Sequence, residues 1–412
     1  MLAHTLGTDR GPCRPMAART RLGCCSPAGI LRAASSLLLG AITVGVAAGG
    51  PIVLSGNEGK LDLTSGGPKV IPAAPPDTLT LLDFGVFPPR IAHLTNLPNT
   101  VIGPPSNIAI SPDGRLALVA NSVKLDTDAA TGFSPDTLIH VLDLESGMPR
   151  RIGEVVAGRQ PSGIAFTADG RHALVANRAD GTVSLLSVAG KELKLDQTVE
   201  VCRPEDSVSD VAIHPGSRLV LASVQKGGYL AVLEMQEGKL LMTPRRISVY
   251  GQPYRCLITP DGQLALTAGQ GYGNGLDADA LSVVDLTAGP ARTVDYVALG
   301  AVPESFDVSP DGNLVAAVVM SGSNLAPEDP NRSDHGTLVV LRRKARTLTR
   351  TQELPIGRIP EGVVFTSDGR HLVVQCHPDR ELWIFEVRRG RVKDSGLRIP
   401  VPGMPSSLRA SP

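Results

Sequence analysis

One short sequence pattern returns seven times along the chain, and this internal repeat most constrains how the chain folds. The first full copy reads "PSNIAISPDGRLALVAN", and the seven copies begin at Pro105, Pro161, Val208, Pro253, Pro303, Pro360 and Pro405. The matched turn positions 114, 170, 217, 262, 312 and 369 are separated by 45 to 57 residues. A period of this length is typical of proteins built from repeated supersecondary units.

Each copy predicts four β-strands. The run "NIAI" predicts a first strand, and "SPDG" predicts a tight turn because Pro presets φ and Gly accepts positive φ. "RLALVAN" predicts a second strand, "TLIHVLDL" a third, and a fourth leads to the next Gly-x-x-Pro. Four antiparallel strands per repeat are typical of a propeller blade. The sequence therefore predicts an all-β, seven-bladed β-propeller.

The two ends of the repeat region complement each other. The last copy, at 405–412, has a first strand only, whereas residues 52–104 contain second, third and fourth strands without a first. We therefore expect residues 52–104 and 405–412 to form blade 1 together, with the C-terminal strand closing the ring. Such closure leaves no open sheet edge at the chain ends. Blades 2–7 are expected to begin near residues 105, 161, 208, 253, 303 and 360.

These copies resemble the YVTN-type repeats of secreted bacterial seven-bladed propellers, over roughly residues 52–412. The wider superfamily includes lactonase-like and muconate-cycloisomerase-like propellers. The resemblance implies the architecture, but an activity has to be argued from the site. Lactonase-like propellers tend to begin one strand with Pro-Arg-His; the nearest match here is Pro253-Tyr254-Arg255-Cys256, in which the His is absent.

Residues 1–50 form a separate leader. Four arginines, at positions 14, 19, 21 and 32, precede a charge-free run from Ala33 to Gly50. Basic residues followed by a short apolar run and small residues are typical of a secretory signal peptide. The run is shorter than the roughly 20 residues that a membrane-spanning helix needs. We expect a periplasmic or secreted protein without a stable membrane span after cleavage; an uncleaved anchor is the alternative.

Composition excludes several classes of partner and cofactor. The 40 basic and 40 acidic residues balance, and aromatic residues make up 3% of the chain, so a nucleic-acid partner is not expected. The propeller region contains Cys202, Cys256 and Cys376, an odd number without a Cys-x-x-Cys motif. No His pair has metal-ligand spacing, so no metal site is predicted. We expect no cofactor, and a monomer.

The two residues that follow the start of each innermost strand are expected to form a solvated rim around the channel mouth. They are Ser106-Asn107, Ser162-Gly163, Ser209-Asp210, Tyr254-Arg255, Glu304-Ser305, Glu361-Gly362 and Ser406-Ser407. Arg255 suits a planar carboxylate, and Glu304 or Glu361 could transfer a proton. Ligand contacts are also expected from Asn107, Asp210 and Tyr254, and from His377 in a neighbouring loop. A purely structural pairing of Arg255 with Asp210 or Glu304 is the alternative.

Two functional hypotheses follow from these residues. The first is a binding module that holds a protein, a glycan or a small anion on the face with the long loops 122–136, 269–279 and 321–336, because length variation gathers where a scaffold carries its binding surface. The second is an enzyme of the lactonase or cycloisomerase type, which would act on a small anionic substrate in the channel mouth through Arg255, Glu304 and Glu361.

The leader generates the first prediction. We expect cleavage near Ala48–Gly50, because small residues there follow the charge-free run. Mass spectrometry of the protein from its native host should show a mature chain that begins close to residue 50. An intact chain that still carries residue 30 would contradict processing at this position.

Overall fold

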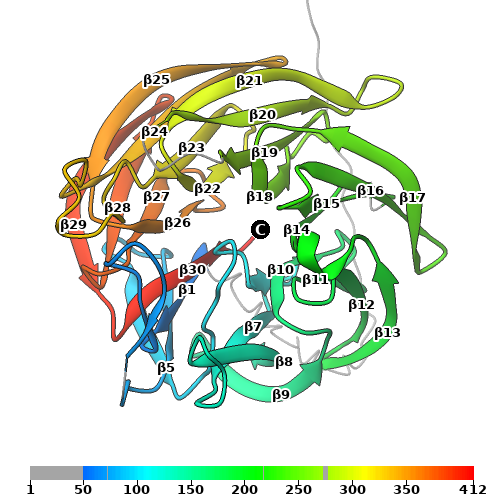
Figure 1. The fold of residues 1–412 in the computed structure, drawn as a ribbon, viewed down its shortest axis with the longest axis horizontal. Helices are drawn as coiled ribbons and strands as arrows, with labels where there is room; N and C mark the ends of the chain where they lie inside the picture. The colour runs from blue at the N-terminus through cyan, green and yellow to red at the C-terminus, as the bar shows by residue number, and fades with distance from the viewer. Residues whose placement is uncertain (1–49, 72, 217, 272–276) are drawn as a thin grey trace, which may run out of the picture. The chain divides into compact units, whose positions relative to one another are not determined.

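The computed structural model describes residues 50–71, 73–216, 218–271 and 277–412. Within them, seven four-stranded antiparallel sheets are arranged radially around a centre (Figure 1). The predicted all-β seven-bladed propeller is therefore confirmed. The leader lies outside the described residues apart from Gly50, so its role as a signal peptide stays a prediction, and residues 272–276 of one long loop lie outside them as well.

The strands of each blade follow one another from the centre of the ring outward (Figure 1). Blade 1 contains β30 (Met404–Ala410), β1 (Ile52–Glu58), β4 (Thr78–Asp83) and β5 (Arg90–Thr95). Blade 2 contains β6 (Ile108–Ile110), β7 (Leu116–Leu125), β8 (Phe133–Asp143) and β9 (Arg150–Val156). Blade 3 contains β10 (Pro161–Phe166), β11 (His172–Asn177), β12 (Thr182–Ala189) and β13 (Glu192–Glu200).

The remaining blades have the same order. Blade 4 contains β14 (Val208–Ile213), β15 (Leu219–Val224), β16 (Tyr229–Gln236) and β17 (Lys239–Ser248). Blade 5 contains β18 (Gln252–Ile258), β19 (Leu264–Gln270), β20 (Asp279–Asp285) and β21 (Arg292–Gly300). Blade 6 contains β22 (Pro303–Val308), β23 (Leu314–Val319), β24 (Gly336–Lys344) and β25 (Thr347–Ile356). Blade 7 contains β26 (Pro360–Phe365), β27 (His371–Cys376), β28 (Glu381–Arg388) and β29 (Arg391–Pro400).

Three short elements lie between these strands: β2 (Leu61–Asp62), β3 (Lys69–Val70) and the 3-10 helix η1 (Pro204–Asp206). The alternating strand directions give the propeller two faces. The face that carries the connections between second and third strands, and those between blades, is called the loop face. The opposite face carries the Ser-Pro-Asp-Gly turns and the hairpins between third and fourth strands, and it is called the turn face.

The repeated turns owe their shape to one aspartate. In the first turn, Asp113 Oδ1 accepts hydrogen bonds from Ser111 Oγ at 2.6 Å and from the Arg115 backbone N–H at 3.1 Å, while Gly114 has a φ of 72°. A left-handed φ of this kind favours glycine. The same bonds recur around Asp261 and Asp368 in blades 5 and 7. The hairpin turn predicted from "SPDG" is therefore present in these blades.

The hydrophobic core lies between neighbouring blades. One cluster joins Val53 and Leu408 of blade 1 to Val364 and Val373 of blade 7, and all four side chains are at most 1% exposed. A single sheet buries little apolar area by itself, so each blade depends on both of its neighbours. Among the described cysteines, Cys256 and Cys376 are buried and none forms a disulfide. No helix in the described part of the chain is long and apolar enough to cross a membrane.

Ring closure occurs as the repeat predicts. β30, from the C-terminal end, pairs antiparallel with β1, from Val53↔Ala410 to Glu58↔Met404. The two strands lie side by side in Figure 1, β30 in red and β1 in blue. Leu408 is fully buried, and Gln375 Nε2 of blade 7 donates to the Ser407 carbonyl at 2.7 Å. The C-terminal strand therefore supplies both the inner edge of blade 1 and a contact surface for blade 7.

Deletion of 405–412 should strongly destabilise the propeller. The change removes the β30 ladder and the buried Leu408 together, so we expect a loss of several kcal/mol, since a single buried leucine truncation costs about 2–5 kcal/mol. Urea unfolding measures the loss, and a chain that lacks only the exposed Pro412 is the control. Equal midpoints for the full chain and the 405–412 deletion would contradict closure by this strand.

Candidate functional site

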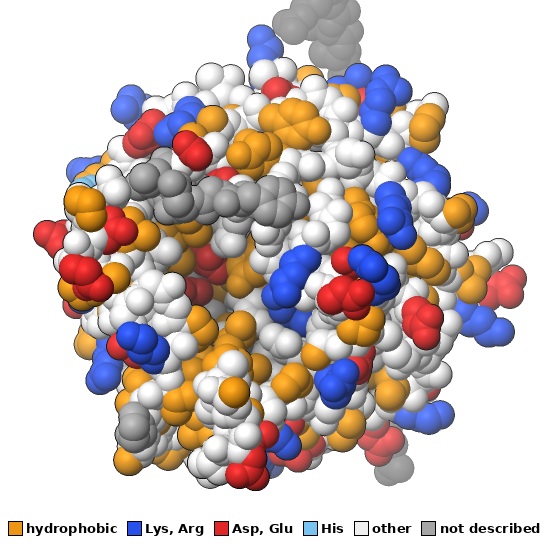
Figure 2. Space-filling model, in the orientation of Figure 1, with side chains coloured by type: hydrophobic (Ala, Val, Ile, Leu, Met, Phe, Trp, Pro, Cys, Tyr) orange, Lys and Arg blue, Asp and Glu red, His pale blue; other side chains and the backbone are white. Residues whose placement is uncertain are grey.

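The innermost strands place short polar segments at the loop-face end of the central channel. In blades 3, 4, 6 and 7 the strand register shifts directly after the first paired residue, and in blade 5 it shifts after the second, Pro253; each shift is a β-bulge. Pro303 pairs with Val319 and Ser305 with Val318, so Glu304 is the additional residue of its bulge. Bulges re-aim side chains and are frequent beside active sites. Figure 2 views the loop face and shows a hollow near its middle with acidic side chains on its wall.

Five ionisable side chains from five blades meet at this end of the channel. We call them the mouth cluster: Glu58, Arg178, Tyr254, Glu304 and Glu361. Arg178 follows β11 in blade 3 and Glu304 begins β22 in blade 6, yet each influences the pKa of the other. Two blades separate them in the ring, so this interaction operates across the channel.

Glu304 is the most constrained acid of the mouth cluster. Its side chain is held by Gln270, whose Nε2 donates to Glu304 Oε2 at 3.1 Å, and the side chain of Tyr254 is near enough to influence its pKa. The residue is 7% exposed. Burial raises the pKa of Glu304 to about 8, although Gln270, Arg178 and Tyr254 favour its charged form. Near neutral pH this carboxyl can therefore both hold and release a proton.

Glu361 and Glu58 continue the acidic side of the cluster. Burial and the neighbouring Glu304 and Glu58 raise the pKa of Glu361 well above its usual range. Burial and Asp77 raise the pKa of Glu58 to about 8, while Lys60 and Thr100 oppose the shift. Unlike Glu304, Glu361 has no basic group that lowers its pKa. Glu361 should therefore be the last of the three to lose its proton.

Arg178 is the basic member of the cluster. Its Nη2 donates to Gln225 Oε1 at 2.8 Å and its Nη1 to Ser209 Oγ, while its Nε has no partner among the described residues. The guanidinium lies 6.0 Å from the centre of the Tyr254 ring. Burial lowers the pKa of Arg178, and Tyr254 and Glu304 oppose that shift. Since Nε is buried, the donors that remain for a ligand oxygen are the second N–H groups of Nη1 and Nη2.

The structure separates Arg255 and Asp210 from the mouth cluster. Arg255 is 1% exposed; its Nη1 donates to Ser305 Oγ at 2.8 Å, and its Nη2 lies 3.8 Å from Asp307 Oδ1. Asp210 Oδ2 accepts the Cys256 backbone N–H at 3.1 Å. These bonds link blade 4 to blade 5 and blade 5 to blade 6. The expected solvated rim is therefore not found at Arg255, and the structural alternative describes both residues better.

Two further sequence-predicted contacts also lie in structural bonds. Asn107 is buried, and its Nδ2 donates to the carbonyls of Asn99 at 3.1 Å and Ala120 at 2.7 Å. His377 is buried where blade 7 meets blade 1, with Nδ1 3.2 Å from the Pro405 carbonyl. Burial lowers the pKa of His377 to about 4, so the ring is neutral near pH 7. Of the predicted set, Tyr254, Glu304 and Glu361 are brought together.

Sequence reasoning did not include Glu58, Arg178, Gln225 or Gln270 among the candidate site residues. All four occupy one repeat position, the residue at the loop-face end of each second strand. In blades 3 and 5 this residue bonds to the bulged residue of the next blade, as Arg178 does to Ser209 and Gln270 to Glu304. The signal was available, since this position is polar in most copies.

The long segments of the loop face differ in structure. Residues 122–136 belong largely to a hairpin extension of β7 and β8, with Val123 opposite Pro135 and Leu125 opposite Phe133. Residues 321–335 form consecutive turns between β23 and β24. Across the described ranges, no group of three or more His, Cys, Asp and Glu side chains could hold a metal ion.

Comparisons with known proteins bear on the fold. No protein-family model matches the chain. No curated protein has a similar sequence. Solved structures do match: a putative 6-phosphogluconolactonase from Bacteroides uniformis has 16% identity and a TM-score of 0.64 over 87% of this chain and 99% of its own. The periplasmic gluconolactonase PpgL from Pseudomonas aeruginosa has 20% identity and a TM-score of 0.63 over 88% and 99%.

Kuenenia stuttgartiensis hydrazine synthase also matches, with 18% identity and a TM-score of 0.57 over 76% of this chain and 91% of its own. Neighbours with such different names and such low identity share the architecture alone. The resemblance to lactonase-like seven-bladed propellers is therefore confirmed as a likeness of fold.

The buried acids predict an unusual dependence of stability on pH. The folded protein keeps protons on Glu304 and Glu58 up to about pH 8, whereas the unfolded chain releases them near the ordinary glutamate pKa of 4.5. Between these values the folded state binds more protons, so the free energy of unfolding should fall as pH rises from about 5 to 8. Each such group contributes a slope of up to about 1.4 kcal/mol per pH unit.

Glu304→Gln should flatten this slope, because an amide has no proton to lose. Urea unfolding at pH 5, 6, 7 and 8 measures it for the wild type and the variant. Glu205→Gln is the control, since Glu205 lies in η1 on the same face with a side chain that is 63% exposed. Parallel slopes for the wild type and Glu304→Gln would show that Glu304 titrates normally.

Proposed function

We propose that the mouth cluster is an active site that hydrolyses small sugar-derived lactones. The observation that carries the proposal is Glu304: a buried carboxyl with a pKa of about 8, held by Gln270, with Tyr254 beside it and Arg178 across the channel. Perturbed pKa values of this kind gather at catalytic sites. The names of two structural neighbours, a putative 6-phosphogluconolactonase and a gluconolactonase, suggest sugar-derived lactones as the class of substrate.

Three residues of the mouth cluster take part in the hydrolysis, each with a different role. Ionised Glu304 accepts a proton from a water molecule whose oxygen forms a bond to the lactone carbonyl carbon. A free Nη N–H of Arg178 donates to the carbonyl oxygen as it becomes negative. The ring C–O bond then breaks, and the Glu361 carboxyl donates its proton to the departing ring oxygen. The product is a hydroxy acid, and a second proton transfer restores both carboxyls.

The assignment of acid and base follows from the surroundings of the two carboxyls. Arg178, Gln270 and Tyr254 favour the ionised form of Glu304. Glu361 faces Glu304 and Glu58, which both favour its neutral form. Two carboxyls whose pKa values are pushed apart are suited to opposite roles. Activity should therefore rise as pH increases through about 8, where Glu304 ionises.

Glu304→Gln should lower kcat/KM for glucono-1,5-lactone by about 10²–10⁴, the usual contribution of a positioned general base. A pH-stat assay, corrected for spontaneous ring opening, measures the rate between pH 6 and pH 9. Glu205→Gln, an exposed acid on the same face, should retain wild-type activity. A wild type that does not hydrolyse aldonolactones would overturn the proposal.

A binding module remains the second candidate, favoured by the hairpin extension at 122–136 and the turns at 321–335, which belong to the loop face. The same samples separate the two functions. Calorimetric binding of the lactone or its hydroxy acid without turnover would assign the mouth to ligand binding. Turnover that Glu304→Gln removes would assign it to catalysis.

A further inference from the structure

One structural position of the turn face carries an acid in most blades and an arginine in blade 6. The position lies near the end of the third strand, opposite the first residue of the second strand. In blades 1 to 7 it is occupied by Asp83, Asp143, Ser187, Glu234, Asp285, Arg342 and Glu386. Arg342 is the only basic residue among them.

Two of the acids at this position join neighbouring blades. Asp143 of blade 2 accepts from Lys191 Nζ at 3.0 Å, and Lys191 lies in the two-residue hairpin between β12 and β13 of blade 3. Asp285 of blade 5 lies 3.1 Å from Arg346 Nε, in the equivalent hairpin of blade 6. At these two interfaces, blades 2–3 and 5–6, an acid in one blade therefore pairs with a base in the hairpin of the next.

Blade 6 and blade 7 cannot form this pair. The hairpin of blade 7 consists of Arg389 and Gly390, so it still supplies a base. The partner position is Arg342, whose Nη2 donates to the Gly390 carbonyl at 3.0 Å. This interface thus has two arginines, whereas the interfaces of blades 2–3 and 5–6 place a lysine or an arginine beside an aspartate.

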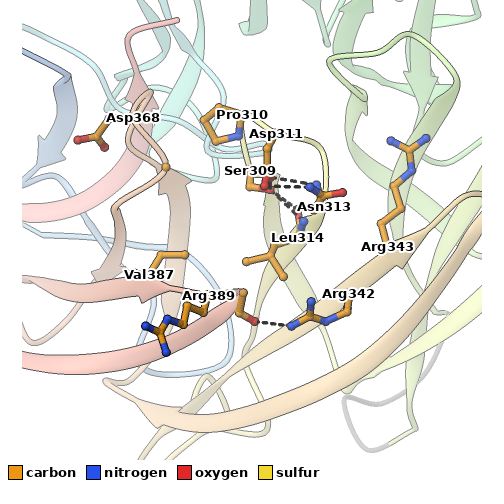
Figure 3. Close-up of a pocket in the computed structure, with 12 residues that line it drawn as sticks. Ser309, Pro310, Asp311, Asn313, Leu314, Arg342, Arg343, Asp368, Val387 and Arg389 are labelled. Carbon is orange, nitrogen blue, oxygen red and sulfur yellow. Dashed lines mark hydrogen bonds between the residues drawn. The ribbon is translucent and has the colours of Figure 1, made fainter. Parts of the chain in front are cut away.

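A cavity lies at this interface. Its volume is about 440 Å³, and Arg342, Arg389, Leu314 and Val387 belong to its lining (Figure 3). Figure 3 shows Arg342 bonded to the hairpin of blade 7, Arg389 on the neighbouring strand end, and Leu314 and Val387 between them and the turns. The volume is within the range of small-molecule pockets.

The other charged residues of the lining already have partners. Asp311 accepts from Ser309 Oγ, the Asn313 backbone N–H and Asn313 Nδ2. Asp368 accepts from Thr366 Oγ1 and the Arg370 backbone N–H. Arg343 lies 2.9 Å from Asp261. Within the described residues, no carboxylate lies within ion-pair distance of Arg342 or Arg389.

We infer that this cavity, defined here as the blade 6–7 pocket, binds a small organic anion with a carboxylate or phosphate group. The two guanidinium groups offer several N–H donors, and guanidinium matches the geometry of both groups. Leu314 and Val387 provide an apolar surface for the carbon body of the ligand. The anion takes the place that the aspartate occupies at the interfaces of blades 2–3 and 5–6.

The pocket is independent of the proposed active site. Glu304 lies near the start of β22 on the loop face, whereas Ser309 follows the end of the same strand on the turn face. A ligand here would therefore stabilise the contact between blades 6 and 7 without occupying the channel mouth.

Isothermal titration calorimetry with citrate and with inorganic phosphate, at constant ionic strength in chloride, tests the inference. The wild type should bind at least one of these probes saturably. Arg342→Asp restores the acid found in other blades, so it should weaken binding at least tenfold and raise the melting temperature in chloride alone. Arg171→Ala is the matched control, because Arg171 is an exposed arginine beside a Ser/Thr-x-Asp-Gly turn of another blade.

Three outcomes would overturn the inference. The first is a wild type that binds neither probe, and the second is an Arg342→Asp variant that binds as tightly as the wild type. The third is loss of binding in Arg178→Gln but not in Arg342→Asp, which would assign the anion to the channel mouth. Glu304→Gln should leave binding at the pocket unchanged, so failure of the lactonase proposal and failure of this one are distinguishable.

Discussion

The pairing of β30 with β1 is the constraint on which the rest of the structure depends. The core lies between blades, so each blade is stable only while both of its neighbours are present. A ring also fixes where the innermost strands begin, and this brings residues from blades as distant as 3 and 6 to face each other across the channel. Without closure the blades could splay apart, and the mouth cluster would lose the geometry that couples its charges.

Burial in this closed ring explains why the acids of the mouth are unusual. Glu304, Glu361 and Glu58 come from three adjacent blades. Burial favours the neutral form of all three, and neighbouring acids add to this effect at Glu361 and Glu58. Arg178 opposes the shift at Glu304 and Lys60 opposes it at Glu58, but no basic group does so at Glu361. The protein therefore holds neutral carboxyl groups at the mouth, an arrangement that is costly for stability above neutral pH and suited to proton transfer.

The fold could be predicted from the sequence because the signal was repeated. Each turn aspartate accepts the same local bonds, and the incomplete copy at 405–412 had one possible partner. The site could be predicted only in part. The bulge after Pro303 directs Glu304 to the channel, whereas the adjacent position of blade 5 directs Arg255 to Ser305 of the next blade, and a strand pattern does not distinguish these directions. Arg178 could not be assigned to the site from the sequence, because its position across the channel from Glu304 depends on the curvature of the whole ring.

The seven copies also provide an internal comparison that a non-repetitive protein lacks. Asp143 and Asp285 perform the same structural role in two blades. Where another blade has a different residue at this position, that contact is lost, and the difference needs its own explanation. Serine occupies the residue after the start of the repeat copy in blades 1, 2, 3 and 4, but Tyr254, Glu304 and Glu361 occupy this position in blades 5, 6 and 7. Arg342 breaks the acidic pattern of the turn face in the same way. Both departures introduce ionisable groups, on opposite faces of the propeller. A repeat protein that folds through the residues common to its blades tolerates a different residue in a single blade. Such differing residues are where we expect a binding or catalytic function.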